Sequence, residues 1–139
     1  IGFKQALKEA GIQKSNDLIK FCEDISTIEA GFKQAMNFYQ NLDKMPDAVF
    51  AANDFLAIGA MKALNELGYS IPDDISVAGF DDIKMSAHIS PSLSTVRIFK
   101  DEMGILAGKR LFELINGITP NPIKLTVGVE PIYRESTRG

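Results

Sequence analysis

The stretch Ala48-Val-Phe-Ala-Ala-Asn-Asp54 decides the fold, because a short apolar run ends in two polar residues and a helical pattern follows at once. Asp54 is expected to cap that helix. Its apolar side chains recur at helical spacing: Ile58, Met61, Leu64 and Leu67. A second apolar run, Ile75–Gly79, follows the turn Pro72-Asp-Asp74. Short buried strands that alternate with helices predict an α/β fold with a parallel sheet flanked by helices.

The same alternation extends toward the start of the chain. A helix is predicted over Gly2–Ala10, and the apolar run Leu18–Cys22 predicts a buried strand. The segment Ser26-Thr-Ile-Glu29 has the Ser-x-x-Glu form of a capping box, which predicts a helix start. The helix that follows carries its apolar side chains on one side: Phe32, Ala35, Met36, Tyr39 and Leu42.

The pattern changes after Phe80. Residues 81–94 form a long polar connection, and Thr95–Ile98 predicts a short extended segment. A helix is predicted over Lys100–Ile115, and two β runs follow it, Ile123–Val127 and Val129–Tyr133.

Composition limits the classes of function. The chain has 139 residues, 45% hydrophobic and 24% charged, as is usual for a globular protein. Its formal net charge is −3 and its Lys and Arg residues do not cluster, so these residues are not predicted to bind DNA themselves. The single cysteine, Cys22, favours a reducing compartment, the cytoplasm. No apolar run reaches the roughly 18 residues of a membrane span.

Candidate catalytic groups do not combine into a recognisable arrangement. His88 is the single histidine, and no Ser or Cys lies in a nucleophile-elbow pattern. The segment Gly104–Lys109 differs from a phosphate-binding loop in its spacing, and Arg110 follows where that loop needs Ser or Thr. Cysteine and histidine lack metal-ligand spacing. The sequence predicts that the chain is not an enzyme and uses no metal or cofactor.

Two polar residues follow predicted strands and form a candidate site. Asn53 follows Ala48–Ala52, and Asp81 follows Ile75–Gly79. Ligands of open α/β sheets bind at the carboxyl edge of the strands. A carboxylate accepts hydrogen bonds from vicinal hydroxyls, whereas an amide both donates and accepts. The pair therefore suits a sugar or another polyol.

Two other interpretations of these residues stay open on spacing alone. Both residues also fit ordinary helix-cap and turn positions. Clustered aspartates at strand ends also occur in phosphate-accepting receiver domains. That class requires an acidic pair after the first strand, where this chain has only Glu23-Asp24.

Ordered segments along the whole chain carry a resemblance to a known family. They are Gly2–Gly11, Pro46–Met61, Ile71–Ile83, Ser90–Arg97 and Arg134–Thr137. Together they resemble the C-terminal portion of the lactose/galactose repressor (LacI/GalR) family. The resemblance implies a periplasmic-binding-protein-like lobe plus a partial second lobe. Members of that family act as dimers on operator DNA, which they contact through an N-terminal headpiece.

The resemblance also implies a division of the chain. Residues 1–80 are expected to form the C-terminal lobe, and residues 81–94 a crossover. Residues 95–127 are expected to be the last elements of the N-terminal lobe, and residues 128–139 the return to the C-terminal lobe. The chain opens at Ile1 inside a helical pattern, so we interpret it as part of a longer protein whose DNA-binding headpiece is absent here.

Site residues carry over from the family by position. Asn53 and Asp81 match residues that contact the effector. Ser26 falls where an aromatic ring often stacks on the ligand, and Ile98 and Lys100 fall where ligand contacts vary. The dimer contacts would include Phe55, Ile58 and Ile89.

The predicted function is the effector-binding and dimerisation region of a repressor, with a sugar as effector and a homodimer as the assembly. Operator DNA is expected to bind only through the absent headpiece. The alternative is a periplasmic sugar-binding protein that serves a transporter. Both alternatives place the ligand at the same strand ends.

Overall fold

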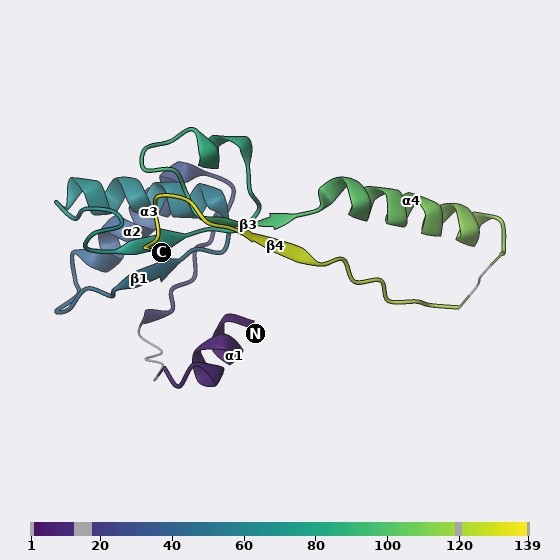
Figure 1. The fold of residues 1–139 in the computed structure, drawn as a ribbon, viewed down its shortest axis with the longest axis horizontal. Coiled ribbons are helices and arrows are strands. Elements are labelled where there is room, and N and C mark those ends of the chain that lie inside the picture. Colours follow the sequence, from purple (N-terminus) through teal and green to yellow (C-terminus); the bar gives the residue numbers. More distant parts are fainter. Residues whose placement is uncertain (1, 13–17, 119–120, 139) are drawn as a thin grey trace.

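A computed structural model describes residues 2–12, 18–118 and 121–138 (Figure 1). Residues 1 and 139, where the predicted domain division begins and ends, lie outside the described part, as do residues 119–120 within the predicted segment 95–127. The elements follow one another as α1 (Gly2–Glu9), α2 (Ile28–Tyr39), β1 (Ala48–Phe50), α3 (Asp54–Glu66), β2 (Ser76–Ala78), a 3-10 helix (Lys84–Ala87), β3 (Thr95–Ile98), α4 (Lys100–Ile115) and β4 (Val129–Ile132).

The core consists of the parallel sheet and the helices α2 and α3, which pack against each other, in agreement with the predicted alternation of strands and helices. Strands β1 and β2 pair in parallel, with Val49 opposite Val77. A parallel bridge joins Ala78 to Ser94 on the far side of β2. The buried apolar side chains come from α2, α3, β2 with the residue before it, and the loop before β3: Ala35, Tyr39, Ala57, Ala60, Met61, Ala63, Leu64, Ile75, Val77 and Leu93.

Two glycines let α2 and α3 approach closely. A Cβ atom at Gly31 would lie 2.7 Å from both the Cα and the carbonyl oxygen of Leu56. A Cβ atom at Gly59 would lie 2.5 Å from the Phe32 nitrogen and would collide with the Ile28 carbonyl oxygen. Each glycine thus receives the backbone of the other helix, which fixes how α3, and the residues at its start, sit on the sheet.

Strands β3 and β4 carry an arm, residues 99–118 and 121–128, away from the rest of the described chain, which we call the body (Figure 1). The two strands are antiparallel, from the pair Thr95–Ile132 to the pair Ile98–Val129. No residue of α4 is buried. Its apolar side instead borders a groove of about 450 Å³, shared with Ile123, Leu125 and Val127.

Two predicted strands are wrong. Residues 18–22 do not pair with β1, and their Leu18 and Phe21 side chains are 48% and 88% exposed. The run Ile123–Val127 is also not a strand. Its alternating Ile123, Leu125 and Val127 face the helix α4 in the arm groove, so packing against a helix explains the alternation without a hydrogen-bonded ladder.

Two predicted helix caps are also wrong, each by one residue. Thr27, not Ser26, caps α2 by accepting from the Ala30 amide at 3.1 Å. Asn53, not Asp54, caps α3 by accepting from the Leu56 amide at 2.9 Å. In both cases the predicted residue finds a different partner, which changes the candidate site.

Candidate functional site

Asn53 and Asp81 lie at the same edge of the parallel sheet. Phe50 pairs with Ala78 at the carboxyl ends of β1 and β2. Asn53 is the third residue after Phe50, and Asp81 is the third after Ala78. The Ala51 amide continues the pairing by donating to the Ala78 carbonyl at 2.9 Å. The two residues therefore leave adjacent parallel strands in register, as the sequence predicts.

The Asn53 side chain links α3 to the segment before α2. Its Oδ1 accepts from the Leu56 amide, and its Nδ2 donates to the Ile25 carbonyl at 2.6 Å. The helix-cap interpretation of Asn53 is therefore correct. A carboxamide carries a second acceptor lone pair and a second N–H, so capping leaves Asn53 one donor and one acceptor for a ligand.

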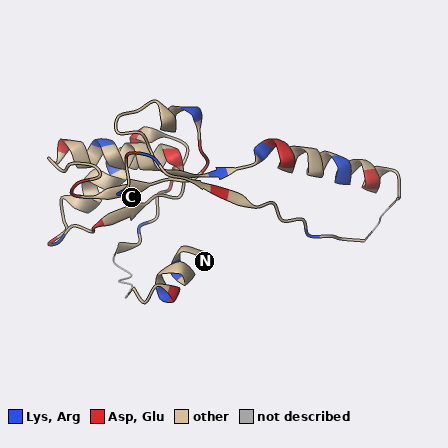
Figure 2. Cartoon of the chain, viewed as in Figure 1, with Lys and Arg blue, Asp and Glu red and all other residues tan. Residues whose placement is uncertain are grey.

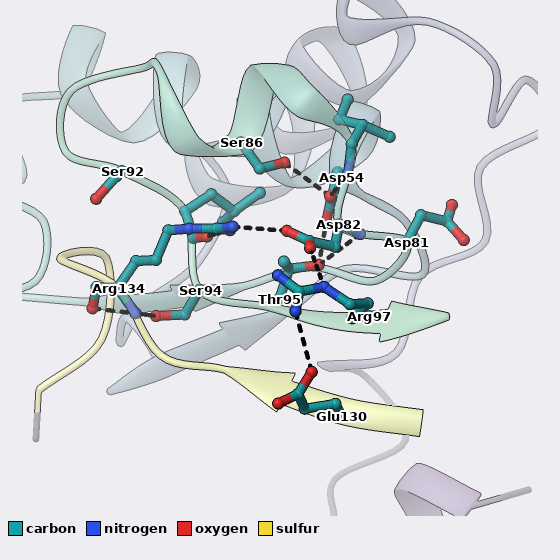
Figure 3. Close-up of polar contacts among 12 residues, drawn as sticks. Asp54, Asp81, Asp82, Ser86, Ser92, Ser94, Thr95, Arg97, Glu130 and Arg134 are labelled. Carbon is teal, nitrogen blue, oxygen red and sulfur yellow. Dashed lines mark hydrogen bonds and ion pairs between the residues drawn. The ribbon is translucent and has the colours of Figure 1, made fainter. Parts of the chain in front are cut away.

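Asp81 has a free carboxylate on a constrained backbone. Its φ of 111° is positive, which costs a non-glycine residue on the order of 1–3 kcal/mol. Its amide donates to the Val96 carbonyl at 2.9 Å. Among the described residues, its carboxylate has no hydrogen-bond or ion-pair partner, and Figure 3 shows it pointing away from the neighbouring Asp54 and Asp82 groups. A partly exposed carboxylate without a partner thus lies at the strand edge.

The other predicted ligand residues lie around this edge at different distances from its groups. The Lys100 ammonium donates to the Asp81 carbonyl at 2.9 Å, which brings Lys100 to the candidate site. Ile98 ends β3 opposite Val129 and is partly exposed. Ser26 is exposed, and its hydroxyl donates to Asp24 at 2.6 Å. It directly follows Ile25, the residue that Asn53 binds, but no described contact joins Ser26 to Asp81.

Asp54 has a structural role that the sequence reasoning missed. Its side chain is fully buried and accepts three hydrogen bonds: from the Ile83 amide at 2.9 Å, the Ser86 hydroxyl at 2.7 Å and the Thr95 hydroxyl at 2.5 Å (Figure 3). A Cβ atom at position 79 would collide with this carboxylate, so Gly79 leaves it space. Asp54 ties the start of α3 to residues 80–94 and to β3.

Asp82 is the second group that the sequence reasoning missed. Its carboxylate binds the Arg97 Nε at 2.7 Å and the Arg134 Nη2 at 2.6 Å, and its side chain is 10% exposed (Figure 3). Burial alone would raise the pKa of Asp82, but the hydrogen bonds and charges of Arg134 and Arg97 outweigh burial and lower that pKa. We call these three residues the clasp. The two arginines belong to two of the sequence segments that resemble the family, which was the available signal.

The segment Arg134–Thr137 binds the loop before β3 through each of its residues. Arg134 donates to the Leu93 carbonyl at 2.7 Å, and Glu135 accepts from the Ser92 amide at 2.8 Å. The buried Ser136 hydroxyl donates to the Val77 carbonyl at 2.6 Å and accepts from the Ser94 amide at 2.8 Å. The Thr137 and Ser94 hydroxyls lie 2.7 Å apart. These contacts return the chain from β4 to the body.

The predicted dimer residues are only partly brought together. Ile58 and Ile89 line one groove of about 370 Å³, with Met61, Lys62, Asn65, Glu66 and Ser90. Phe55 is partly buried and does not line this groove.

Basic and acidic residues are mixed along the described part of the chain (Figure 2). Figure 2 shows Lys and Arg interspersed with Asp and Glu along both the body and α4. Within residues 2–12, 18–118 and 121–138, no helix has both the length and the apolar content that crossing a membrane requires.

Comparison with known proteins adds family information. A family model described as a periplasmic binding protein-like domain matches residues 1–137. The "Lactose operon repressor" of Rhizobium radiobacter is 40% identical over 110 residues, which are 79% of this chain and 96% of that sequence. The first curated relatives are HTH-type transcriptional repressors, 34–42% identical, and the chain spans 33–40% of their length.

Solved structures give the same result. A "transcriptional regulator CelR-cellobiose complex" superimposes with a TM-score of 0.90 at 28% identity, over 97% of this chain and 40% of that chain. A Lac repressor dimer bound to operator and the anti-inducer ONPF superimposes with a TM-score of 0.83 at 28% identity, over 99% and 46%. These relatives are regulators rather than enzymes, and they favour regulation over the transporter alternative.

Proposed function

Because this chain belongs to the LacI/GalR family and matches part of its periplasmic-binding-protein-like effector region, we propose that it binds a sugar or related polyol at the carboxyl ends of β1 and β2. One observation carries the proposal: the Asp81 carboxylate is free and partly exposed at the same strand edge as Asn53, whose amide keeps one donor and one acceptor. Hydrogen bonds from sugar hydroxyls to an ionised acceptor contribute about 1.5–3 kcal/mol each.

The other predicted ligand residues have separate roles in this proposal. Lys100, already at the Asp81 carbonyl, would give the site a cation beside its carboxylate. Ile98 and Ser26 would border the ligand, Ile98 without a hydrogen-bonding group and Ser26 with a small hydroxyl in place of a stacking ring.

The division of the chain follows from the same proposal. Residues 1–80 and 128–139 would form one lobe, residues 81–94 the crossover, and residues 95–127 would belong to a second lobe. The apolar side of α4 supports this division, because Ile123, Leu125 and Val127 border it within the described chain but leave no residue of α4 buried. The rest of the second lobe and the DNA-binding headpiece would come from other parts of a longer protein.

The partners follow from the relatives. The Lac repressor structure contains a dimer on its operator, and the CelR structure contains cellobiose. We assign this chain a homodimeric assembly with Phe55, Ile58 and Ile89 at the contact, and operator binding through a headpiece. The place of action would be the cytoplasm, where operator DNA lies.

Calorimetric titration of the full-length protein tests the proposal, with cellobiose, D-glucose and D-galacturonate as probes. The parent protein is expected to bind at least one probe. Asp81→Ala is expected to weaken that binding by about ten- to a hundredfold, since it removes one or two charge-assisted hydrogen bonds. Operator affinity without sugar should not change, because operator binding is assigned to the headpiece and not to this strand edge.

Asp73→Ala is the matched control, since Asp73 is an exposed aspartate in the turn before β2. It should bind the probe as the parent does. Unchanged probe binding by Asp81→Ala would contradict the site, and turnover of a probe would contradict a purely regulatory role.

A further inference from the structure

The two aspartates after β2 turn their carboxylates in different directions. The Asp81 carboxylate faces the open strand edge, whereas the Asp82 carboxylate lies between Arg97 and Arg134 (Figure 3). Both residues have positive φ angles, 111° and 47°. Two successive non-glycine residues rarely both have a positive backbone φ unless the surrounding contacts impose it. The contacts of Asp82 therefore help to determine where Asp81 points.

The clasp is well placed to impose this geometry. The Asp82 side chain is 10% exposed and that of Arg134 is 16% exposed, so their ion pair is shielded from solvent and salt. The Asp82 amide also donates to the Thr95 hydroxyl at 3.4 Å. Asp81 itself is held only through its backbone, by Val96 and Lys100.

The two arginines belong to the two connections between body and arm. Arg97 is in β3, and Arg134 follows the end of β4 at Ile132. These strands are antiparallel neighbours, and the arm departs from their far end (Figure 1). The clasp thus joins the turn that carries Asp81 to both connections, at the point where they enter the body.

We infer that Asp82 is a positioning residue. Through its ion pairs with Arg97 and Arg134, it holds Asp81 in its ligand-facing orientation and couples it to β3 and β4. The effector part of this inference rests on the proposed function, whereas the positioning of Asp81 does not. Asp82 acts through its neighbour, and no contact between Asp82 and the ligand is involved.

A double-mutant cycle on the full-length protein tests the inference, with the tightest-binding of cellobiose, D-glucose and D-galacturonate as the probe. Asp82→Asn and Arg134→Gln are each expected to weaken probe binding by about tenfold. The double variant should weaken it by no more than either single variant, because both single variants break the same Asp82–Arg134 ion pair. Glu130→Gln is the control. It removes only the outer 3.0 Å pair with Arg97 and should stay within about twofold of the parent.

Urea unfolding of the same variants separates positioning from stability. A purely structural role predicts that the variants lose stability but, while folded, bind the probe as the parent does. That result, or additive effects of Asp82→Asn and Arg134→Gln, would overturn the inference. Arg97→Gln provides a further variant if Asp82→Asn does not fold, and it is expected to weaken probe binding in the same direction.

Hydrogen exchange provides a measurement that needs no ligand. In Asp82→Asn, the Asp81 amide should exchange faster, while the Val77 amide, bonded to the Ser136 carbonyl at 2.7 Å, should keep its protection. Equal protection of the Asp81 amide in parent and variant would refute the positioning. If the parent binds none of the probes, the proposed function fails, and this exchange measurement still decides the positioning of Asp81.

Discussion

The Thr95 hydroxyl donates to the Asp54 carboxylate at 2.5 Å, joining the start of β3 to the start of α3 across 41 positions of sequence. The same fully buried carboxylate also binds the Ile83 amide and the Ser86 hydroxyl. Three donors from two segments therefore depend on one side chain. Removing it would leave all three without their acceptor in the protein interior.

Asp54→Ala is expected to lower the free energy of unfolding by about 3 kcal/mol or more, because each buried unsatisfied donor costs roughly 1–3 kcal/mol. Urea unfolding followed by circular dichroism measures this change. Asp43→Ala, at an exposed aspartate, is the control and should lie within about 0.5 kcal/mol of the parent. A loss as small as that of Asp43→Ala would show that Asp54 is not a structural hub.

Gly59→Ala is expected to destabilise the body by about 1–3 kcal/mol, since the added Cβ meets the backbone of α2 and overpacks a close helix contact. Gly104→Ala in α4 is the matched control, with no atom within 4 Å of its added Cβ. It should be neutral or stabilise α4 by about 0.5–1 kcal/mol. Similar losses for the two variants would contradict the close approach of α2 and α3.

The buried Tyr39 side chain is expected to make the folded protein less stable at alkaline pH. Burial raises the pKa of Tyr39 to about 12, from an ordinary 10.0. The folded state therefore keeps the Tyr39 proton at a pH where the unfolded chain has released it. The contribution of the protonated Tyr39 phenol to the free energy of unfolding is complete below pH 10. It is lost as the pH rises toward 12, by about 2–3 kcal/mol in total.

Tyr39→Phe should remove this part of the alkaline decline, as measured by unfolding free energy against pH. Tyr133→Phe is the control, because the Tyr133 side chain is 82% exposed. Parallel alkaline profiles for the parent and Tyr39→Phe would be inconsistent with a buried phenol.

Ile58→Asp tests the proposed dimer contact by placing a charge in the groove that Ile58 shares with Ile89. Sedimentation of the full-length protein should show a dimer for the parent and a monomer for the variant at micromolar concentration, since an unpaired charge buried in an interface costs several kcal/mol. Ile12→Asp makes the same change at an exposed position outside the groove and should stay dimeric. A parent that is strictly monomeric above micromolar concentration would refute the pairing.

The positions of the core helices and strands were predictable from the sequence, because these elements bury one apolar side and so show a regular spacing of apolar residues. Strands β1 and β2, the helices α2 and α3 and the shared edge of Asn53 and Asp81 all agree with the pattern. The helices α1 and α4 also lie where the sequence predicts them, although they bury no residue. The run 18–22 was not predictable, because an apolar run shows that a strand is favourable but does not show whether a partner strand lies beside it. The run Ile123–Val127 was wrongly predicted as a strand, because its alternating apolar side chains pack against α4 and not within a sheet.

The polar network was not predictable because its partners are distant in sequence. In the pair Asn53-Asp54, either residue can cap a helix, and only the folded chain shows that Asn53 caps while Asp54 is buried. Asp82 meets Arg134 across 52 positions. Sequence spacing reports local geometry, whereas these contacts depend on how β3, β4 and the chain end return to one place.

The pairing of Ile98 with Val129 closes the β3–β4 ladder, so everything between them leaves and re-enters through one pair of opposed residues. An antiparallel pair of this kind can be joined by a tight turn of about two residues, such as Asn-Gly. Replacing the residues between positions 98 and 129 by that turn would remove the whole arm. The shortened polypeptide would keep Asp82, Arg97 and Arg134 together and provide a minimal scaffold in which ligand recognition can be rebuilt one lobe at a time.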